Sequence, residues 1–303
     1  MEFGVQTRGP YEELLETVLW AESRGASAFA VPDHYLTRGA NSNPAWDALA
    51  HLAGLTRETA TIRLATLVSP VTFRHPAVLY KMGVTLDEMS GGRFTLGLGA
   101  GWMDEEFEVY GLPYPSLKMR MEMYEEAMAY LRAAITPGSH AFEGKHYQIA
   151  DFDPHPIPID LRLMGGGFGK PKARRITALY ADEYNLYARP PADYAEIREQ
   201  TRAEAEAAGR DPGSIVWTSA SPALAAKKES DYRRILEAVA NLSGQTTEHI
   251  EEVYEERQYP HGSGAKASEM LAALGEAGCE LYYLQMFGVD RADYDLILDA
   301  YEG

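Results

Sequence analysis

The stretch that decides the fold, residues 161–187, has the sequence LRLMGGGFGKPKARRITALYADEYNLY. It begins with an apolar run, Leu161–Met164, that predicts a short strand, and the glycines of Gly165–Gly169 predict a turn. A helical pattern continues through Tyr180, and a second strand is predicted at Glu183–Tyr187. A strand, a turn, a helix and another strand in this order are typical of the βα units around a parallel sheet.

The same alternation continues on both sides of this stretch and predicts eight strands. They lie at Phe3–Thr7, Ala28–Val31, Ile62–Val71, Arg93–Gly99, Leu161–Met164, Glu183–Tyr187, Ile215–Ser219 and Leu281–Met286. Uniform strand lengths, and a last helix that follows the eighth strand directly, favour a closed (β/α)8 TIM barrel of the α/β class over a doubly wound sheet. We expect one domain over residues 1–303, with a rim insertion around 136–160 that could form part of a lid.

Apolar residues at helical spacing predict the helices of the first half of the chain. They are expected at about Tyr11–Arg24, at about Pro44–Arg57, after His75–Pro76, and as one long helix from Asp104 to about Ile135. The acidic residues 104–106 suit the start of that long helix, because the helix dipole favours negative charge there. Segment 220–264 receives no functional assignment.

The composition limits the classes of partner. The chain has 303 residues and a formal net charge of −17, from 45 acidic and 28 basic residues spread along it, which argues against nucleic acid. No apolar run is long enough for a membrane span and no basic leader is present, so we expect a cytoplasmic protein without a membrane partner. The lone Cys279 excludes an internal disulfide and is expected to be a packed side chain.

Asp33 and His34 follow the second predicted strand directly. Chemistry in barrels takes place at the C-terminal ends of the strands, and a histidine beside a carboxylate can accept, donate or shuttle a proton near neutral pH. His34 is therefore a candidate catalytic residue. The alternative is a rim histidine that only forms hydrogen bonds with its neighbours.

The fifth predicted turn is a candidate phosphate site. It contains Gly165, Gly166, Gly167, Phe168, Gly169 and Lys170, and further basic residues open the helix that follows. Backbone amides at a helix N-terminus, with cations nearby, bind phosphate even in an acidic protein. The alternative is a flexible hinge with solvated basic side chains.

The glycines of Gly97–Gly101 begin like a dinucleotide-binding fingerprint. Trp102 stands where the third glycine would be, and the unit is the fourth rather than the first, so we reject a Rossmann site. The glycines instead allow the fourth strand to pass under a flat ring, with Trp102 as a wall of the site or as a plug of the core.

No metal site is expected, although the insertion is rich in possible ligands. These are His140, His146, His155, Asp151 and Asp153, and their spacing matches no ligand motif. The sequence also contains no Walker loop and no nucleophile elbow, so a hydrolase has no motif to support it.

Four blocks together resemble the luciferase-like superfamily, in particular its oxidoreductases that depend on the deazaflavin coenzyme F420. The blocks are Val31–Tyr35, Leu67–Pro76, Gly97–Gly111 and Gly165–Asn185. The resemblance spans most of the chain and is weakest between about Pro190 and Gly278. It is specific for the superfamily, less so for the cofactor, and hardly at all for the substrate.

The resemblance implies a set of cofactor contacts. The glycine-rich turn would hold the cofactor phosphate, and the ring would lie across the ends of strands two to four. The implied ring contacts are Asp33, Thr66, Leu67, Ser69, Ala100, Gly101 and Trp102, with a non-prolyl cis peptide expected at Thr66–Leu67. The resemblance also gives His34 the proton-transferring role. The sugar-phosphate dehydrogenases of the family have a glutamate where Trp102 aligns, which implies a flatter or more apolar substrate here.

The predicted function is hydride transfer between F420 and a small organic substrate, with His34 moving the accompanying proton. One alternative is an FMN-dependent monooxygenase on the same barrel, in which the insertion shields the site from water. Another is a barrel that binds a flavin without catalysis. By analogy with the family we expect a homodimer.

Overall fold

The structure is a computed structural model that describes residues 1–37, 45–138, 140–153 and 155–303. The barrel strands in these residues are β1 (Glu2–Gln6), β2 (Ala28–Val31), β3 (Arg63–Thr66), β5 (Phe94–Gly99), β8 (Arg162–Gly167), β9 (Glu183–Leu186), β10 (Val216–Pro222) and β13 (Leu281–Gln285). All pairings between them are parallel, β3 pairs with β5, and β13 pairs with β1. The strands therefore close on themselves, which confirms the predicted (β/α)8 barrel of the α/β class.

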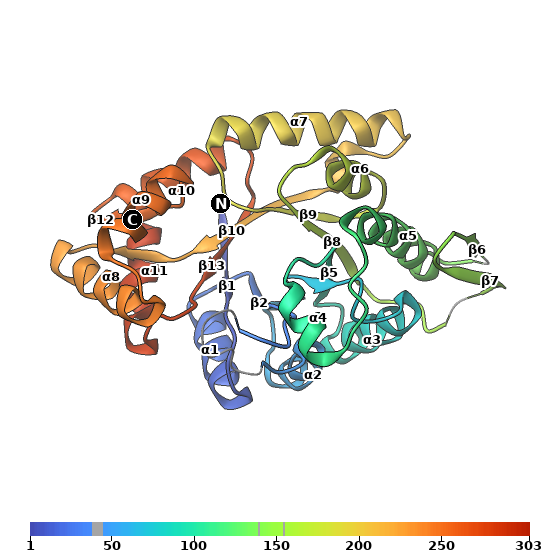
Figure 1. The fold of residues 1–303 in the computed structure, drawn as a ribbon, viewed down its shortest axis with the longest axis horizontal. Coiled ribbons are helices and arrows are strands. Elements are labelled where there is room, and N and C mark those ends of the chain that lie inside the picture. Colours follow the sequence, from blue (N-terminus) through green and yellow to red (C-terminus); the bar gives the residue numbers. More distant parts are fainter. Residues whose placement is uncertain (38–44, 139, 154) are drawn as a thin grey trace.

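Helices surround the barrel, and the strands β6 (His140–Glu143) and β7 (Gln148–Phe152) lie outside it (Figure 1). The helices are α1 (Tyr11–Ser23), α2 (Ala48–Glu58), α3 (Pro76–Ser90), α4 (Asp104–Tyr110), α5 (Leu117–Ile135), α6 (Pro171–Tyr180), α7 (Pro191–Ala207), α8 (Glu229–Ser243), α9 (Thr247–Glu256), α10 (Lys266–Glu276) and α11 (Tyr294–Glu302). Two 3-10 turns are Pro212–Ser214 and Arg291–Asp293. None of the helices in the described ranges combines the length and apolar composition that crossing a membrane requires.

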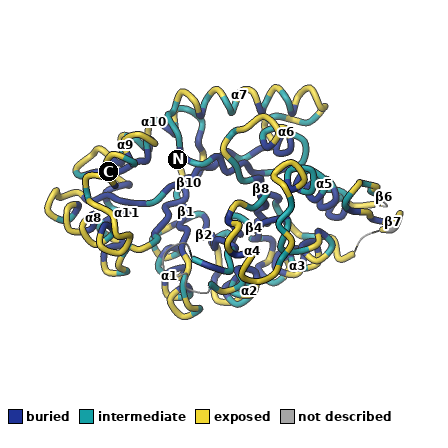
Figure 2. Tube along the Cα trace, viewed as in Figure 1, coloured by how far each residue is buried: buried dark blue, intermediate teal, exposed yellow. Residues whose placement is uncertain are grey.

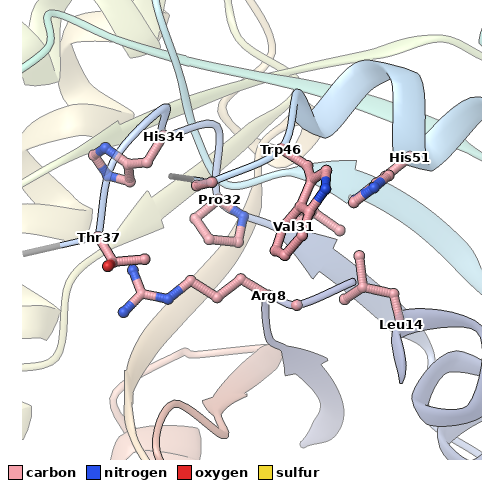
Figure 3. Close-up of a pocket in the computed structure, with 10 residues that line it drawn as sticks. Arg8, Leu14, Val31, Pro32, His34, Thr37, Trp46 and His51 are labelled. Carbon is pink, nitrogen blue, oxygen red and sulfur yellow. The ribbon is translucent and has the colours of Figure 1, made fainter. Parts of the chain in front are cut away.

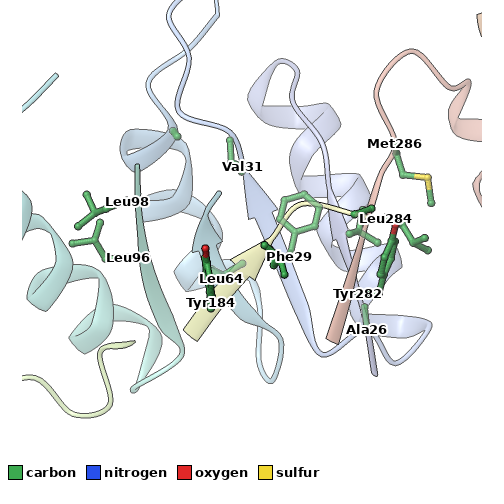
Figure 4. Close-up of a cluster of buried hydrophobic side chains, with 14 of the residues drawn as sticks. Ala26, Phe29, Val31, Leu64, Leu96, Leu98, Tyr184, Tyr282, Leu284 and Met286 are labelled. Atoms are coloured by element: carbon green, nitrogen blue, oxygen red, sulfur yellow. The ribbon is translucent and has the colours of Figure 1, made fainter. Parts of the chain in front are cut away.

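Successive side chains of each strand point to opposite faces of the sheet, and this alternation divides the core into two parts. Ala28 and Ala30 belong to a small cluster inside the barrel, whereas Phe29 and Val31 belong to the larger cluster between strands and helices. Small side chains on the inner face leave room for the barrel to close. The strands are buried while the outer faces of the helices are exposed (Figure 2), and aromatic and aliphatic side chains from several strands fill the space between them (Figure 4).

The third predicted strand, Ile62–Val71, is broken in the structure. It consists of β3 and the two-residue strand β4 (Ser69–Pro70), and the backbone between them bulges. The non-prolyl cis peptide joins Leu67 to Val68, one bond later than the expected Thr66–Leu67 bond. Thr66 still belongs to the ladder with β2, so the bulge begins only after it.

The long helix predicted from Asp104 to about Ile135 is two helices. Gly111 adopts a left-handed conformation (φ 65°) that ends α4, and Pro113 and Pro115 follow it. A second helix, α5, then starts at Leu117, where the Ser116 side chain accepts a hydrogen bond from the Met119 amide. Helix α2 begins at Ala48 after an Asp47 cap, and its predicted start, Pro44, lies outside the described residues.

The insertion forms an antiparallel hairpin of β6 (His140–Glu143) and β7 (Gln148–Phe152). Both strands lie within the predicted insertion, residues 136–160. The carboxylate of Glu126 on α5 accepts hydrogen bonds from the amides of Lys145 and His146. The hairpin thus packs on the helical layer beside α5 (Figure 1), and this packing does not place it across the strand ends as a lid.

Segment 220–264 adds a small parallel sheet beside the barrel. Strand β11 (Leu224–Ala226) continues from β10 and pairs with β12 (His261–Ser263), and α8 and α9 lie between them in sequence. Cys279 is buried just before β13, and burial raises the pKa of its thiol to about 12, consistent with a packed side chain.

Candidate active site

A histidine and a buried glutamate form the centre of the candidate site. His34 follows β2, and its Nδ1 lies 3.0 Å from Oε1 and 3.3 Å from Oε2 of Glu106. Glu106 is on the first turn of α4, after β5, and is fully buried. The Tyr35 amide donates a second hydrogen bond to Oε2 of Glu106, at 2.9 Å. The glutamate therefore fixes one edge of the imidazole and leaves Nε2 for another partner.

From the sequence, Glu106 was predicted only to lie at the start of a helix. Asp104 and Glu105, its neighbours in the same acidic run, are exposed. The available signal was topological: His34 and Glu106 follow strands at the same end of the barrel, so a buried acid in the run could have been paired with the histidine. No pattern within residues 104–106 distinguished the acid that turns inward.

Trp102 stands next to His34 at the mouth of the barrel. Their ring centroids are 5.5 Å apart in an edge-to-face arrangement, and the tryptophan is 55% exposed. This exposure excludes the core plug and leaves the wall of the site, the other predicted position. Ala100 and Gly101 precede it, and Gly101 has the positive φ (77°) that its turn out of β5 requires.

Asp33 is fully buried and paired with an arginine. Arg74 donates a hydrogen bond of 2.5 Å to Oδ2 of Asp33, and it also pairs with Asp47, the cap of α2. Burial alone lowers the pKa of Arg74, but the two carboxylates outweigh this effect and raise it above its ordinary value. This ion-paired group ties the loop that carries His34 to the start of α2.

Two glutamines form the floor beneath the mouth. Nε2 of Gln6 donates to the Leu67 carbonyl at 2.6 Å, and Nε2 of Gln285 donates to Oε1 of Gln6 at 2.7 Å. Tyr187 donates to Oε1 of Gln285 at 3.3 Å. This chain of hydrogen bonds holds the bulge after β3 against the ends of β1, β13 and β9. Thr66 supports the bulge from the other side, through hydrogen bonds with the backbone of Gly97.

The ends of β5 and β8 contain glycines where a side chain would not fit. A Cβ on Gly99 would lie 2.9 Å from Val68, and a Cβ on Gly166 would lie 2.8 Å from it. These glycines therefore allow the bulge to pass close to the strand ends. The Ser69 hydroxyl beside them is buried and has no hydrogen-bond partner among the described residues. A polar group of this kind is satisfied when a ligand with a polar edge binds.

The glycine-rich turn differs from the predicted one. Gly165–Gly167 belong to β8, and the turn contains only Phe168, Gly169 and Lys170. The pairing of β5 with β8 ends at Leu98 and Gly165, so Gly166 and Gly167 have no β5 partner in the described ranges. Backbone there can approach a ligand, and Lys170 is exposed at the start of α6.

A cleft of about 430 Å³ opens beside His34, between the ends of β1 and β2 (Figure 3). Arg8 and Thr37 line it with His34, and Trp46 and His51 line it from the α2 side. This volume is in the range of small-molecule sites. No local motif marks Arg8, Trp46 or His51, so these residues could not be identified from the sequence.

The predicted residues thus gather at one end of the barrel. His34, Asp33, Trp102 and the bulge surround the ends of β2, β3 and β5, and the glycines of β8 lie on the next strand. On the insertion, His146 pairs with Glu122 of α5 and His155 pairs with Asp153. The side chain of His140 lies outside the described part. No group of three possible ligands that could hold a metal ion occurs within the described ranges.

Proteins of two kinds are similar in sequence to this chain. The pyrimidine monooxygenase RutA of Agrobacterium fabrum is 32% identical over 191 residues, which is 59% of this chain and 50% of that protein. The F420-dependent glucose-6-phosphate dehydrogenase of Amycolatopsis mediterranei is 30% identical over 164 residues, 52% of this chain and 49% of that protein. The chain therefore spans about half the length of these curated relatives.

Solved structures of both kinds share the fold. An F420-dependent secondary alcohol dehydrogenase, in complex with an F420-acetone adduct, superposes with a TM-score of 0.78 at 20% identity and covers 99% of this chain and 98% of its own. The EDTA monooxygenase of Chelativorans sp. BNC1 gives 0.79 at 14% identity, with 99% and 92% covered. At these identities the likeness concerns the fold alone. The model of the luciferase-like monooxygenase family, however, matches residues 2–280, nearly the whole length, and on this evidence the chain belongs to that family.

Proposed function

We propose that this protein is an F420-dependent oxidoreductase that transfers a hydride between the coenzyme and a small organic substrate. The observation that carries the proposal is the contact of His34 with buried Glu106 at the mouth of the barrel. Such a pair is suited to move a proton near neutral pH, as hydride transfer to or from an alcohol or carbonyl carbon requires. A barrel that only binds a flavin has no use for it.

The residues at the strand ends fit a flat cofactor with a phosphate. Ser69 offers a buried hydroxyl that lacks a partner among the described residues, and the bulge around Leu67 and Val68 would support the ring. Gly166 and Gly167 leave the backbone at the end of β8 accessible to the phosphate, with Lys170 nearby. Asp33, Ala100 and Gly101 would complete the contacts. When bound, F420 would supply the hydride acceptor or donor.

The chain's own residues would handle the proton and exclude water. The Glu106 carboxylate accepts from Nδ1 of His34, which leaves a lone pair on Nε2 to take the hydroxyl proton of a substrate as a hydride leaves the adjacent carbon. In the reverse direction the same atom returns the proton to the oxygen. The exposed ring of Trp102 would close over the substrate and exclude water.

An FMN-dependent monooxygenase is the second candidate. The 32% identity to a protein named as a pyrimidine monooxygenase favours it, and the exposed Trp102 could equally shield an oxygen-sensitive site. The two candidates differ in their use of oxygen, which an experiment can measure.

The test compares two assays of the same purified protein. One follows the absorbance of oxidised F420 with a panel of small alcohols, and the other follows oxygen uptake with reduced FMN and uracil. Turnover of F420 that falls about a hundredfold or more in His34→Ala supports the proposal. Oxygen uptake that depends on FMN and uracil, without F420 turnover, contradicts it and favours the monooxygenase.

A further inference from the structure

The cleft beside His34 contains a cation without a carboxylate partner. Arg8 follows β1, and its guanidinium lies 5.1 Å from the centroid of the Phe287 ring. No carboxylate among the described residues forms an ion pair with it, and the residues outside the description, 38–44, 139 and 154, include no acidic side chain. Arg8 is exposed to solvent, so its charge is available to a ligand that enters the cleft.

Acidic residues are plentiful in the chain as a whole, which has a net charge of −17. Arg74 and Arg234, for example, form ion pairs with aspartate, whereas Arg8 is one of several arginines in the described residues that form none. The cleft lining includes Arg8 and two histidines but no acidic residue. A local positive charge in a concave site attracts an anion even when the whole protein is negative.

The other side of the cleft offers a flat aromatic surface. The rings of Trp46 and His51 are nearly parallel, 29° apart, with centroids separated by 5.9 Å. Burial lowers the pKa of His51, with Asp47 opposing the effect, which favours the neutral imidazole. Figure 3 shows Trp46 and His51 at one side of the cleft, and the guanidinium of Arg8 extended toward Thr37 at the other.

We infer that the substrate is a small organic anion with a flat ring, bound between the guanidinium of Arg8 and the Trp46–His51 surface, beside His34. This inference names the substrate class of the proposed oxidoreductase and rests on that function. Arg8 is a binding residue in it, because it would contact a carboxylate or phosphate away from the carbon that exchanges the hydride. The cleft of about 430 Å³ has room for a substrate of one or two rings.

The test uses two probes of nearly equal shape, 4-fluorobenzoate and 4-fluorobenzamide, titrated into the full-length protein and followed by fluorine NMR. We expect the benzoate to bind at least about tenfold more tightly than the benzamide, a difference of about 1.4 kcal/mol. Arg8→Met should remove this preference, and Arg8→Lys should retain part of it. Equal binding of both probes, no binding of either, or an unchanged preference in Arg8→Met would overturn the inference.

Arg291→Met is the matched control. Arg291 also lies over an aromatic ring, 4.9 Å from the centroid of Trp20, and it does not line the cleft. The Arg291→Met variant should leave the preference for benzoate unchanged. Thermal unfolding of each variant, with Arg8→Lys as the conservative change, separates loss of binding from loss of the fold.

Titration of the same proteins with F420 separates the two proposals. Equal F420 affinity of the wild type and Arg8→Met, together with the lost preference for benzoate, supports both. If the preference depends on Arg8 while neither F420 nor FMN binds, the anion site stands and the proposed oxidoreductase fails. If Arg8→Met loses F420 affinity as well, Arg8 serves the cofactor, and the substrate assignment is overturned.

Discussion

Nδ1 of His34 lies 3.0 Å from Oε1 of Glu106, a glutamate that solvent does not reach. The two residues are 72 positions apart and come from loops after β2 and β5. Because the carboxylate also accepts from the Tyr35 amide, its orientation is fixed from two sides. In the proposed reaction, Glu106 would therefore act through the imidazole, as a positioning residue.

Replacement of Glu106 by Gln should lower kcat by about 10- to 100-fold, with KM changed by less than about threefold, because the amide stabilises a protonated imidazole less well than a carboxylate does. Steady-state kinetics, with kcat and KM determined separately, would measure both effects. Glu105→Gln, on the exposed side of the same turn, is the control. Equal effects of the two substitutions would refute the positioning role.

Gly166 and Gly167 are neighbours in β8, and their alanine variants form a matched pair of test and control. A Cβ on Gly166 would lie 2.8 Å from the Val68 side chain, whereas one on Gly167 would lie 3.4 Å from Ala173, an ordinary contact. Gly166→Ala should displace the bulge and weaken cofactor binding by about tenfold or more. The added methyl of Gly167→Ala would point toward α6 and leave the backbone at the strand end accessible, so this variant should stay within about threefold of the wild type. Fluorescence titration with F420 measures both. Similar affinities of the two variants would show that the bulge does not support the cofactor.

Gln6 joins two parts of the barrel floor through hydrogen bonds to Leu67 and Gln285. Gln6→Leu would leave a buried carbonyl and a buried amide without partners, and it should lower the free energy of unfolding by about 1 to 3 kcal/mol. Urea denaturation measures this change. Gln148→Leu on exposed β7 should stay within about 0.5 kcal/mol. A Gln6→Leu protein as stable as the wild type would mean that water replaces the lost bonds.

Glu183 should make stability depend on pH. It lies at the start of β9, at the end of the barrel opposite the site, and burial raises its pKa to about 7, although Thr218 and the Arg162 charge oppose the shift. A carboxyl whose folded pKa is raised binds more protons in the folded state. Its unfavourable effect is therefore absent below the unfolded pKa of about 4.5 and grows as the pH rises toward 7.

Glu183→Gln should remove this penalty. The free energy of unfolding of the variant, relative to that of the wild type, should increase by on the order of 2 kcal/mol from pH 5 to pH 8. Chemical denaturation at the two pH values gives the difference, and Glu237→Gln on the exposed side of α8 is the control. A stability difference that is the same at both pH values would show that Glu183 does not titrate in this range.

The barrel was predictable because its signals are local. Each strand is a short apolar run, and glycines such as Gly25 and Gly91 end helices in the left-handed conformation. The strand and helix boundaries that were predicted wrongly depend on tertiary contacts or on short breaks in the sequence pattern. The bulge at Leu67–Val68 is held by Gln6, which is distant in sequence, and Gly111 interrupts an apolar pattern that continues on both sides of it.

The site was predicted in part for the same reason. His34 and Trp102 follow strands, and the glycines of β8 form the end of one, so their place at the mouth follows from the fold. Glu106 and Arg74 were missed because their significance lies in contacts with His34 and Asp33, which only the folded chain creates. The Gly165–Gly167 run seemed to be a turn because strands seldom contain three consecutive glycines.

Equilibrium binding of F420 and of FMN to the purified protein tests the central claim most directly. The account predicts that F420 binds at least about tenfold more tightly than FMN, and that Gly166→Ala weakens F420 binding while Gly167→Ala does not. Binding of FMN without binding of F420 would contradict the assignment of a deazaflavin-dependent oxidoreductase and would make the monooxygenase the better description.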